Sequence, residues 1–255
     1  MGRGVVRFQE GFQDLVSAAD ERCVRRFGPR LRGTYVAGSV AAGEAWPGAS
    51  DLDGFVFLKN EPTPADRAWS RRTRKRLERD FPIAAEVHLN VHSVGRLQRE
   101  GFWRFILRYN AVQVRGKNLV AELERRGAPT PRPSRRLAQS RVPFVRKCLE
   151  EALAGRCPPA LAELPSDPFL ATRKLARNFV IVEGAFVLMC ERAFRSFNQE
   201  VVLHGLRSHW RRWRGLTRTT QTILDDPFRA AVQPDDFMQR VHPFVSWAID
   251  VIDSA

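Results

Sequence analysis

The stretch that decides the fold is Gly38-Ser39, followed after eleven residues by Asp51-Leu52-Asp53 and the apolar run Gly54-Phe55-Val56-Phe57-Leu58. Residues i and i+2 of a β-strand point to the same face, so the side chains of Asp51 and Asp53 lie on one face of the strand. Carboxylates held this close repel each other, and a divalent cation relieves the repulsion. Mg²⁺ commonly binds one or two carboxylates together with phosphate oxygens, and a Gly-Ser turn lets a phosphate approach the backbone. The stretch therefore predicts metal-dependent chemistry on a nucleoside triphosphate.

Apolar periodicity on either side of this stretch predicts a series of helices and strands. Helices are expected over residues 8–27, 62–79, 96–109 and 118–126, and strands over 31–37, 52–58, 83–94 and 112–114. The third strand alternates clearly, with Val87, Leu89 and Val91 on one side and Glu86, His88, Asn90 and His92 on the other. Alternation of this kind indicates a half-buried strand with one polar face.

A proline-rich segment divides the chain. Residues 127–134 read Gly-Ala-Pro-Thr-Pro-Arg-Pro-Ser, which stiffens the backbone and interrupts any helix. Beyond it the apolar pattern is helical throughout, with breaks at prolines. We therefore expect an α+β protein: an α/β domain with a mixed sheet over residues 1–127, a linker over 128–134, and an all-helical domain over 135–255.

The composition is 44% hydrophobic and 27% charged, which is typical of soluble globular proteins. No apolar run reaches the roughly 18 to 20 residues that span a bilayer, so we expect a cytoplasmic protein with no membrane partner. The formal net charge of +14 would attract anionic partners. The basic residues are nearly all arginine and are dispersed along the chain, as also happens with a GC-rich genome, which leaves nucleic-acid binding open. The oligomeric state is likewise left open.

A third carboxylate is expected to join the two aspartates. Glu86 lies on the polar face of the third strand, and a strand next to that of Asp51 and Asp53 would bring it to the same centre. Three carboxylates around two Mg²⁺ ions would position a triphosphate and activate an attacking hydroxyl. The alternative is that Glu86 is solvated on an exposed face beside His88. His88 itself is a candidate contact to substrate, because it lies on the same face.

The motif resembles the signature of the DNA polymerase β-type nucleotidyltransferase superfamily, in which a Gly-Ser turn precedes an acidic-apolar-acidic-apolar run by about ten residues. Here the match runs from Gly38-Ser39 through Pro47 and Ser50 to Asp51-Leu52-Asp53. It is most similar to small bacterial members of the aminoglycoside-adenylyltransferase type, which carry a third acidic residue on a later strand, matched by Glu86. The resemblance covers residues 31–120, and the helical half matches by architecture only.

Two further features bear on the resemblance. Residues 109–119 resemble the short turn that follows the third acidic strand in those enzymes. Gly54, directly after Asp53, departs from the pattern, in which an apolar residue is common. A glycine inside a strand predicts a close approach by backbone or ligand, or a bulge.

The resemblance implies roles for the matching residues. Asp51 and Asp53 would bind the two metal ions, and Glu86 would complete the ligand set or act as the base toward the acceptor hydroxyl. Gly38-Ser39 would hold the β- and γ-phosphates through a backbone N–H and a hydroxyl. Ser50 would cap the turn or touch a phosphate.

The helical half contributes further candidate residues. Residues 175–190 are almost wholly apolar, yet they contain Arg177 and Glu183. In the resembled family the C-terminal helices close the nucleotide cleft, so Lys174 and Arg177 would bind phosphate and Glu183 the acceptor. The alternative for Glu183 is an ion pair with an arginine in the core. Further on, Val202, Leu206, Trp210 and Trp213 form one helical stripe, which predicts packing rather than stacking on nucleic-acid bases.

These observations predict an enzyme: a metal-dependent nucleotidyltransferase that moves a nucleoside monophosphate, AMP from ATP, to an acceptor hydroxyl and releases pyrophosphate. The acceptor is left open among a small molecule such as an antibiotic, a protein side chain and RNA. The basic composition argues against a polycationic aminoglycoside, which needs an acidic pocket. The alternative function is an inactive nucleotide-binding or nucleic-acid-binding module on the same fold.

Overall fold

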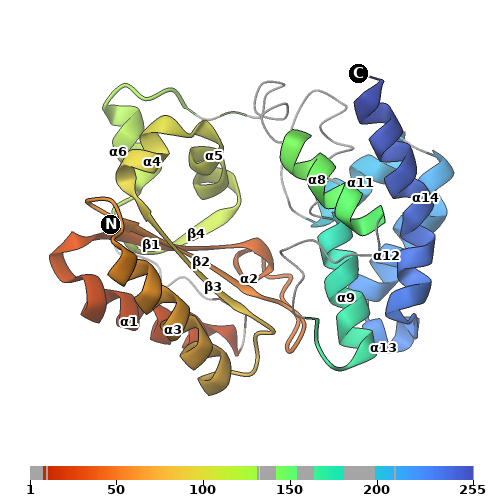
Figure 1. Ribbon diagram of the computed structural model, residues 1–255, viewed down its shortest axis with the longest axis horizontal. Coiled ribbons are helices and arrows are strands. Elements are labelled where there is room, and N and C mark those ends of the chain that lie inside the picture. Colours follow the sequence, from red (N-terminus) through yellow and green to blue (C-terminus); the bar gives the residue numbers. More distant parts are fainter. Residues whose placement is uncertain are drawn as a thin grey trace. The chain divides into compact units, whose positions relative to one another are not determined.

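The computed structural model describes residues 8–9, 11–130, 132, 142–153, 164–180, 199–209 and 211–254. The chain divides into two compact units, Met1–Arg132 and Pro133–Ala255. Figure 1 shows strands and helices together in the first unit and labels only helices in the second.

A four-stranded mixed sheet forms the centre of the first unit, with strand order β3-β2-β1-β4. Its strands are β1 (Leu31–Ala37), β2 (Leu52–Leu58), β3 (Val87–Ser93) and β4 (Ala111–Gly116). β1 pairs antiparallel with both β2 and β4, whereas β2 and β3 run parallel. The helices of this unit are α1 (Phe12–Phe27), α2 (Gly38–Ala42), α3 (Pro64–Asp80), α4 (Val94–Arg99), α5 (Gly101–Tyr109) and α6 (Leu119–Arg125), with a 3₁₀ turn, η1 (Gly28–Arg30).

Helices α1 and α3 cover one face of the sheet (Figure 1). The core between them combines strand side chains from one face of the sheet with the buried sides of the two helices. Its fully or nearly fully buried members include Phe12, Leu15, Val36, Leu52, Leu77 and Val87. Burying each large apolar side chain contributes about 1.5–3 kcal/mol. This face of β2 therefore fixes the strand register, and with it the direction of the intervening aspartates.

Helix α5 packs on part of the opposite face. The ring of Trp103 lies 5.4 Å from that of Phe55, and Phe57 contacts Tyr35 at 5.9 Å between centroids. Phe55 and Phe57 are on the same face of β2 as Asp53, because they follow it at intervals of two. The apolar half of this face is thus packed, and the aspartates lie at its other end.

The second unit contains the helices α8 (Val142–Leu153), α9 (Pro168–Asn178), α11 (Gln199–His209), α12 (Arg214–Asp225), α13 (Pro227–Ala230) and α14 (Pro234–Asp253), and the 3₁₀ turn η4 (Arg211–Trp213). No strand occurs among its described residues. Among the described residues, no helix has the length and apolarity needed to cross a membrane.

The expected α+β class with a mixed sheet is confirmed. The strands expected over 31–37 and 52–58 have those bounds in the structure. The third strand is shorter than expected, since β3 begins only at Val87 and residues 81–86 form a connection. One segment of helical periodicity, 96–109, is two helices, because the chain is extended at Glu100 between α4 and α5.

Candidate functional site

The acidic residues gather at one end of the sheet because of how β2 and β3 pair. In the parallel register Leu52 lies opposite Val87 and Asp53 opposite His88. One step earlier the same register places Asp51 opposite Glu86, and the backbone N–H of Leu52 donates to Glu86 O at 2.9 Å. Side chains of paired residues in a sheet point to the same face. Two aspartates and Glu86 are thus brought to one face, as the sequence predicted for adjacent strands.

Three side chains come close enough there to share a cation. One ligand atom each from Asp51, Glu86 and His88 lies within 4.8 Å of the other two. His88 Nε2 is 3.6 Å from Glu86 Oε2, and these two side chains are 24% and 15% exposed. Two carboxylates and an imidazole are a donor set that fits a divalent cation.

Arg74 of α3 holds the Glu86 carboxylate by the oxygen that does not face His88. Its Nη2 lies 2.8 Å from Glu86 Oε1, and its Nε donates to Val87 O at 2.6 Å. The guanidinium therefore ties the side chain of Glu86 to the backbone of the next residue. This leaves Oε2 as the carboxylate oxygen that faces His88. Glu86 is therefore not simply solvated on an exposed face, because its side chain is only 15% exposed and pairs with Arg74.

Asp53 lies beside this cluster rather than within it. Its carboxylate rests against Gly38, where a Cβ atom would overlap Asp53 Oδ2. Gly38 has φ of +69°, a conformation that L side chains rarely adopt. Glycine at this position therefore provides both the turn from β1 into α2 and the space for the Asp53 carboxylate.

The two serines of the predicted phosphate site are both buried. Ser39 is buried in the first turn of α2. Ser50 is also buried, and its hydroxyl accepts a hydrogen bond from the Trp46 backbone N–H at 2.8 Å. The Ser50 side chain thus closes the loop that leads into Asp51.

Gly54 allows β2 and β3 to approach each other closely. A Cβ at this position would lie 2.8 Å from His88 O and 3.0 Å from Leu89 Cδ2. Any side chain would push the backbone of β3 away from β2. The sequence left open a close approach by backbone or ligand, or a bulge, at Gly54. The structure shows a close approach by backbone, that of His88 in the cluster.

The turn after β4 lies away from the acidic residues. Asp53 pairs with Ala37 at one end of β1, whereas Gly116 pairs with Gly33 four residues away. At about 3.3 Å per residue the separation along the strand is ~13 Å.

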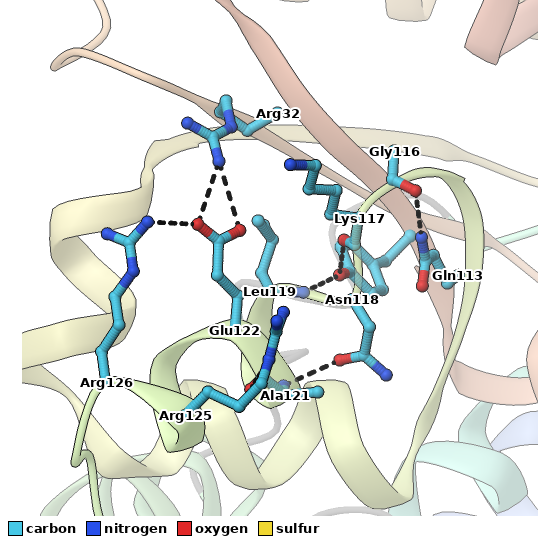
Figure 2. Close-up of polar contacts among 11 residues, drawn as sticks. Arg32, Gln113, Gly116, Lys117, Asn118, Leu119, Ala121, Glu122, Arg125 and Arg126 are labelled. Carbon is cyan, nitrogen blue, oxygen red and sulfur yellow. Dashed lines mark hydrogen bonds and ion pairs between the residues drawn. The ribbon is translucent and has the colours of Figure 1, made fainter.

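Internal contacts hold this turn. Tyr35 Oη donates to Lys117 O at 3.0 Å and accepts from the Leu119 N–H at 2.9 Å. Asn118 caps α6 by accepting from Ala121 N at 3.0 Å (Figure 2). The segment that resembles the family's turn is therefore a structural junction between β4 and α6.

His92 shares the polar face of β3 but belongs to the packed half of the sheet. Its Nδ1 lies 2.8 Å from Arg96 Nη1, and its ring lies 5.5 Å from that of Trp103. Burial, and then the charge of Arg96, lower the pKa of His92 to about 4. An arginine only donates, so Nδ1 is the acceptor and the imidazole is neutral at pH 7. His92 is therefore a packing residue, distinct from His88.

The candidates of the second unit stay predictions. Lys174 and Arg177 lie in α9 and are 3% and 8% exposed. Neighbouring Arg173 is also buried and donates to Leu224 O at 3.1 Å. Glu183 lies outside the described residues.

Sequence reasoning missed Arg74. It lies in the run Arg71-Arg72-Thr73-Arg74-Lys75-Arg76, where a solvated helix face is the ordinary interpretation. The available signal was that a carboxylate expected near two aspartates needs a positive partner. The choice among five basic residues depended on which side of α3 faces β3, and the sequence alone does not give that.

Comparison with solved structures identifies a similar fold. The chain is similar to spectinomycin adenyltransferase AAD(9) from Enterococcus faecialis, solved with ATP and spectinomycin, with a TM-score of 0.60 and 11% identity. The match covers 94% of this chain and 99% of that one. At this identity the likeness shows a shared α+β fold and nothing finer. A toxin–antitoxin structure with AMP-PNP matches 52% of this chain and 97% of that one at 15% identity, with a TM-score of 0.31, too low to support an argument. No protein-family model and no curated protein matches the sequence.

Proposed function

We propose that this chain is a metal-dependent nucleotidyltransferase that transfers AMP from ATP to a hydroxyl group of a small molecule. The observation that carries the proposal is the meeting of Asp51 and Glu86 on one sheet face, beside Asp53 and Gly38, in a chain with an adenyltransferase fold. A group of carboxylates with partial neutralisation by Arg74 suits a divalent cation and a triphosphate.

In the proposed reaction the acceptor oxygen attacks the α-phosphorus of ATP in line with the leaving group. The new bond joins that oxygen to the α-phosphorus, the bond to the β-phosphate bridging oxygen breaks, and pyrophosphate leaves. Asp51, Asp53 and Glu86 are the residues that would hold the metal ions, which neutralise charge on the triphosphate. Glu86 either completes this ligand set or takes the hydroxyl proton.

The remaining site residues have supporting roles in this proposal. Gly38-Ser39 would contact the β- and γ-phosphates at the turn where Asp53 lies. Lys174 and Arg177 of α9 stay candidate phosphate-binding residues, as the family resemblance implies. We assign positioning and charge neutralisation, rather than covalent catalysis, as the main sources of rate enhancement.

A small-molecule acceptor is favoured because the similar adenyltransferase was solved with ATP and spectinomycin. Protein side chains and RNA are the competing acceptor classes, and a screen of pyrophosphate release across antibiotics, RNA and lysate proteins separates them. The net charge of +14 makes anionic or neutral hydroxyl compounds better first choices than polycations.

Substitution of either aspartate tests the site. Asp51→Asn and Asp53→Asn remove a charged ligand with little change in size, so pyrophosphate release should fall about a thousandfold, equivalent to several kcal/mol of lost charge stabilisation. Circular dichroism should show an intact fold in both variants. Asp14→Asn, an exposed position on α1 in the same unit, is the matched control and should keep full activity. Near-normal turnover in either site variant would show that the assignment is wrong.

The alternative, an inactive nucleotide-binding module, makes a different prediction. Isothermal titration with ATP would then show binding that needs no metal, and no pyrophosphate would form with any acceptor. The proposed enzyme needs the metal for tight ATP binding and releases pyrophosphate once the acceptor is present.

A further inference from the structure

We propose that His88 is a nitrogen ligand of the metal site and that it directs this site toward first-row transition ions such as Mn²⁺ rather than Mg²⁺. The proposal deepens the proposed function and rests on it, because it concerns the identity of the ion that the three-residue cluster takes.

The backbone fixes the position of the imidazole. His88 follows Glu86 by two residues and lies opposite Asp53 in the parallel register, so all of these side chains point to the same face. Gly54 reinforces the arrangement, because its missing side chain lets the His88 backbone approach β2. His88 therefore lies beside the carboxylates as a consequence of strand pairing.

The distances fit a shared ion. Ligands at about 2.1 Å from one octahedral cation are ~3.0 Å apart when adjacent and ~4.2 Å apart when opposite. His88 Nε2 and Glu86 Oε2 are 3.6 Å apart, and the Asp51 ligand atom lies within 4.8 Å of both. Small rotations of side chains that are only partly buried bring these atoms to ligand spacing.

The imidazole is not needed to neutralise Glu86. Arg74 already pairs with Glu86 Oε1 at 2.8 Å, whereas 3.6 Å between His88 Nε2 and Oε2 is too long for a hydrogen bond. Arg74 also limits Glu86 to a single free oxygen, so the carboxylate would bind through Oε2 alone. Glu86 Oε2 and His88 Nε2 therefore lie 3.6 Å apart, where both can bind the same ion.

The donor set decides the class of ion. Mg²⁺ strongly prefers oxygen and is normally held by carboxylates, waters and phosphates. An imidazole nitrogen raises the affinity of a site for divalent transition metals, because these ions bind nitrogen ligands more tightly than Mg²⁺ does. A site with two carboxylates and one imidazole therefore favours first-row transition ions over Mg²⁺, and Mn²⁺ is the member of that series that best suits the carboxylate and phosphate oxygens as well. The Mg²⁺ predicted from the sequence follows from the carboxylates alone.

Mn²⁺ itself is the probe for the test, added to the full-length protein without nucleotide. Electron paramagnetic resonance counts bound Mn²⁺ from the loss of the free-ion signal, and electron spin-echo modulation detects a directly bonded ¹⁴N. We expect ¹⁴N coupling in the wild-type protein, its loss in His88→Asn, and an apparent Kd for Mn²⁺ that rises about tenfold or more in that variant. Affinity for Mg²⁺, measured by competition, should change less than about twofold, since Asn keeps an oxygen donor.

The control variant is His242→Asn, which removes an exposed imidazole from the second unit and should leave both signals unchanged. Bound Mn²⁺ without ¹⁴N coupling in the wild-type protein, or no Mn²⁺ bound at millimolar concentration, would overturn the proposal. The wild-type spectrum decides this even if His88→Asn folds poorly. Failure of the proposed function is distinguishable, because it would appear as nitrogen-coupled Mn²⁺ with no pyrophosphate release on any acceptor.

Discussion

At the scale of single residues, Gly38 connects local backbone geometry to the site. Its φ of +69° turns the chain from β1 into α2, and its lack of a side chain leaves room for the Asp53 carboxylate. Gly43, at the other end of the same short helix, has a similar φ of +73° but no atom within 4 Å of a built Cβ. Of these two glycines with positive φ, only Gly38 has the Asp53 carboxylate where a side chain would lie.

Alanine at each position separates strain from displacement of the aspartate. Gly38→Ala and Gly43→Ala should each lose about 1–2 kcal/mol of unfolding free energy, because both place a side chain at positive φ. Only Gly38→Ala should weaken binding of ATP with its metal, by about tenfold or 1.4 kcal/mol, because its Cβ displaces Asp53. Isothermal titration and urea unfolding measure the two effects. Equal ATP affinity in both variants would refute a role for the Gly38–Asp53 contact in nucleotide binding.

Most of these residue positions follow from the sequence, but their contacts do not. The i, i+2 spacing places Asp51 and Asp53 on one face, and strand alternation places Glu86 and His88 with them. Sequence spacing does not show which side chains the Asp51 and Asp53 carboxylates each contact. In the structure Asp51 faces Glu86 and His88, while Asp53 faces Gly38, because side-chain direction is set by the register and the turn.

At the scale of elements, α3 supports the site by linking α1 to β3. At its first turn Asp66 is fully buried, caps the helix together with Thr63, and pairs with Arg30 at 2.7 Å and Arg26 at 3.1 Å. The Arg30 hydrogen bond holds the pKa of Asp66 well below its usual range, so the carboxylate is ionised at neutral pH. Farther along the helix, Arg74 holds Glu86.

Loss of the Asp66 carboxylate should therefore destabilise the first unit. We expect Asp66→Ala to cost about 3 kcal/mol at pH 7, the lower end for breaking a buried ion pair, because the two arginines are 37% and 36% exposed and regain hydration. Asp80→Ala, at the other end of α3, breaks an exposed pair with Arg22 of α1 and should cost less than about 1 kcal/mol. Urea unfolding compares them, and equal costs would contradict the structural role of Asp66.

The bounds of an element are predictable where the apolar periodicity and the polar or helix-breaking residues at its ends agree. They are less predictable where the two signals conflict. The strand at 52–58 is bounded by polar residues on both sides and has its predicted limits. The stripe from Val202 to Trp213 predicts one helix, yet α11 ends at His209 and Trp213 lies in η4. Val202 and Leu206 are buried as expected. Trp213 instead packs at 5.2 Å from Phe244 and lies under Arg212.

At the scale of the whole molecule, the arginine excess has a structural component. Many arginines of the first unit pair with carboxylates of other elements, for example Arg32 with Glu122, Arg108 with Glu124 and Arg115 with Asp20 (Figure 2 shows the first of these). Net charge alone therefore does not indicate a nucleic-acid surface. The proposed reaction class rests on the motif and the fold, whereas the acceptor depends on side chains that no motif specifies.

In the proposed reaction AMP, and not a terminal phosphate, is transferred. The measurement is incubation of the protein and its divalent cation with an acceptor from the screen and ATP labelled with ³²P at either the α or the γ position. We predict that label from α-³²P ATP appears on the acceptor, that label from γ-³²P ATP appears only in pyrophosphate, and that Asp51→Asn abolishes both. Label on the acceptor from the γ position, or inorganic phosphate as the sole labelled product, would rule out AMP transfer.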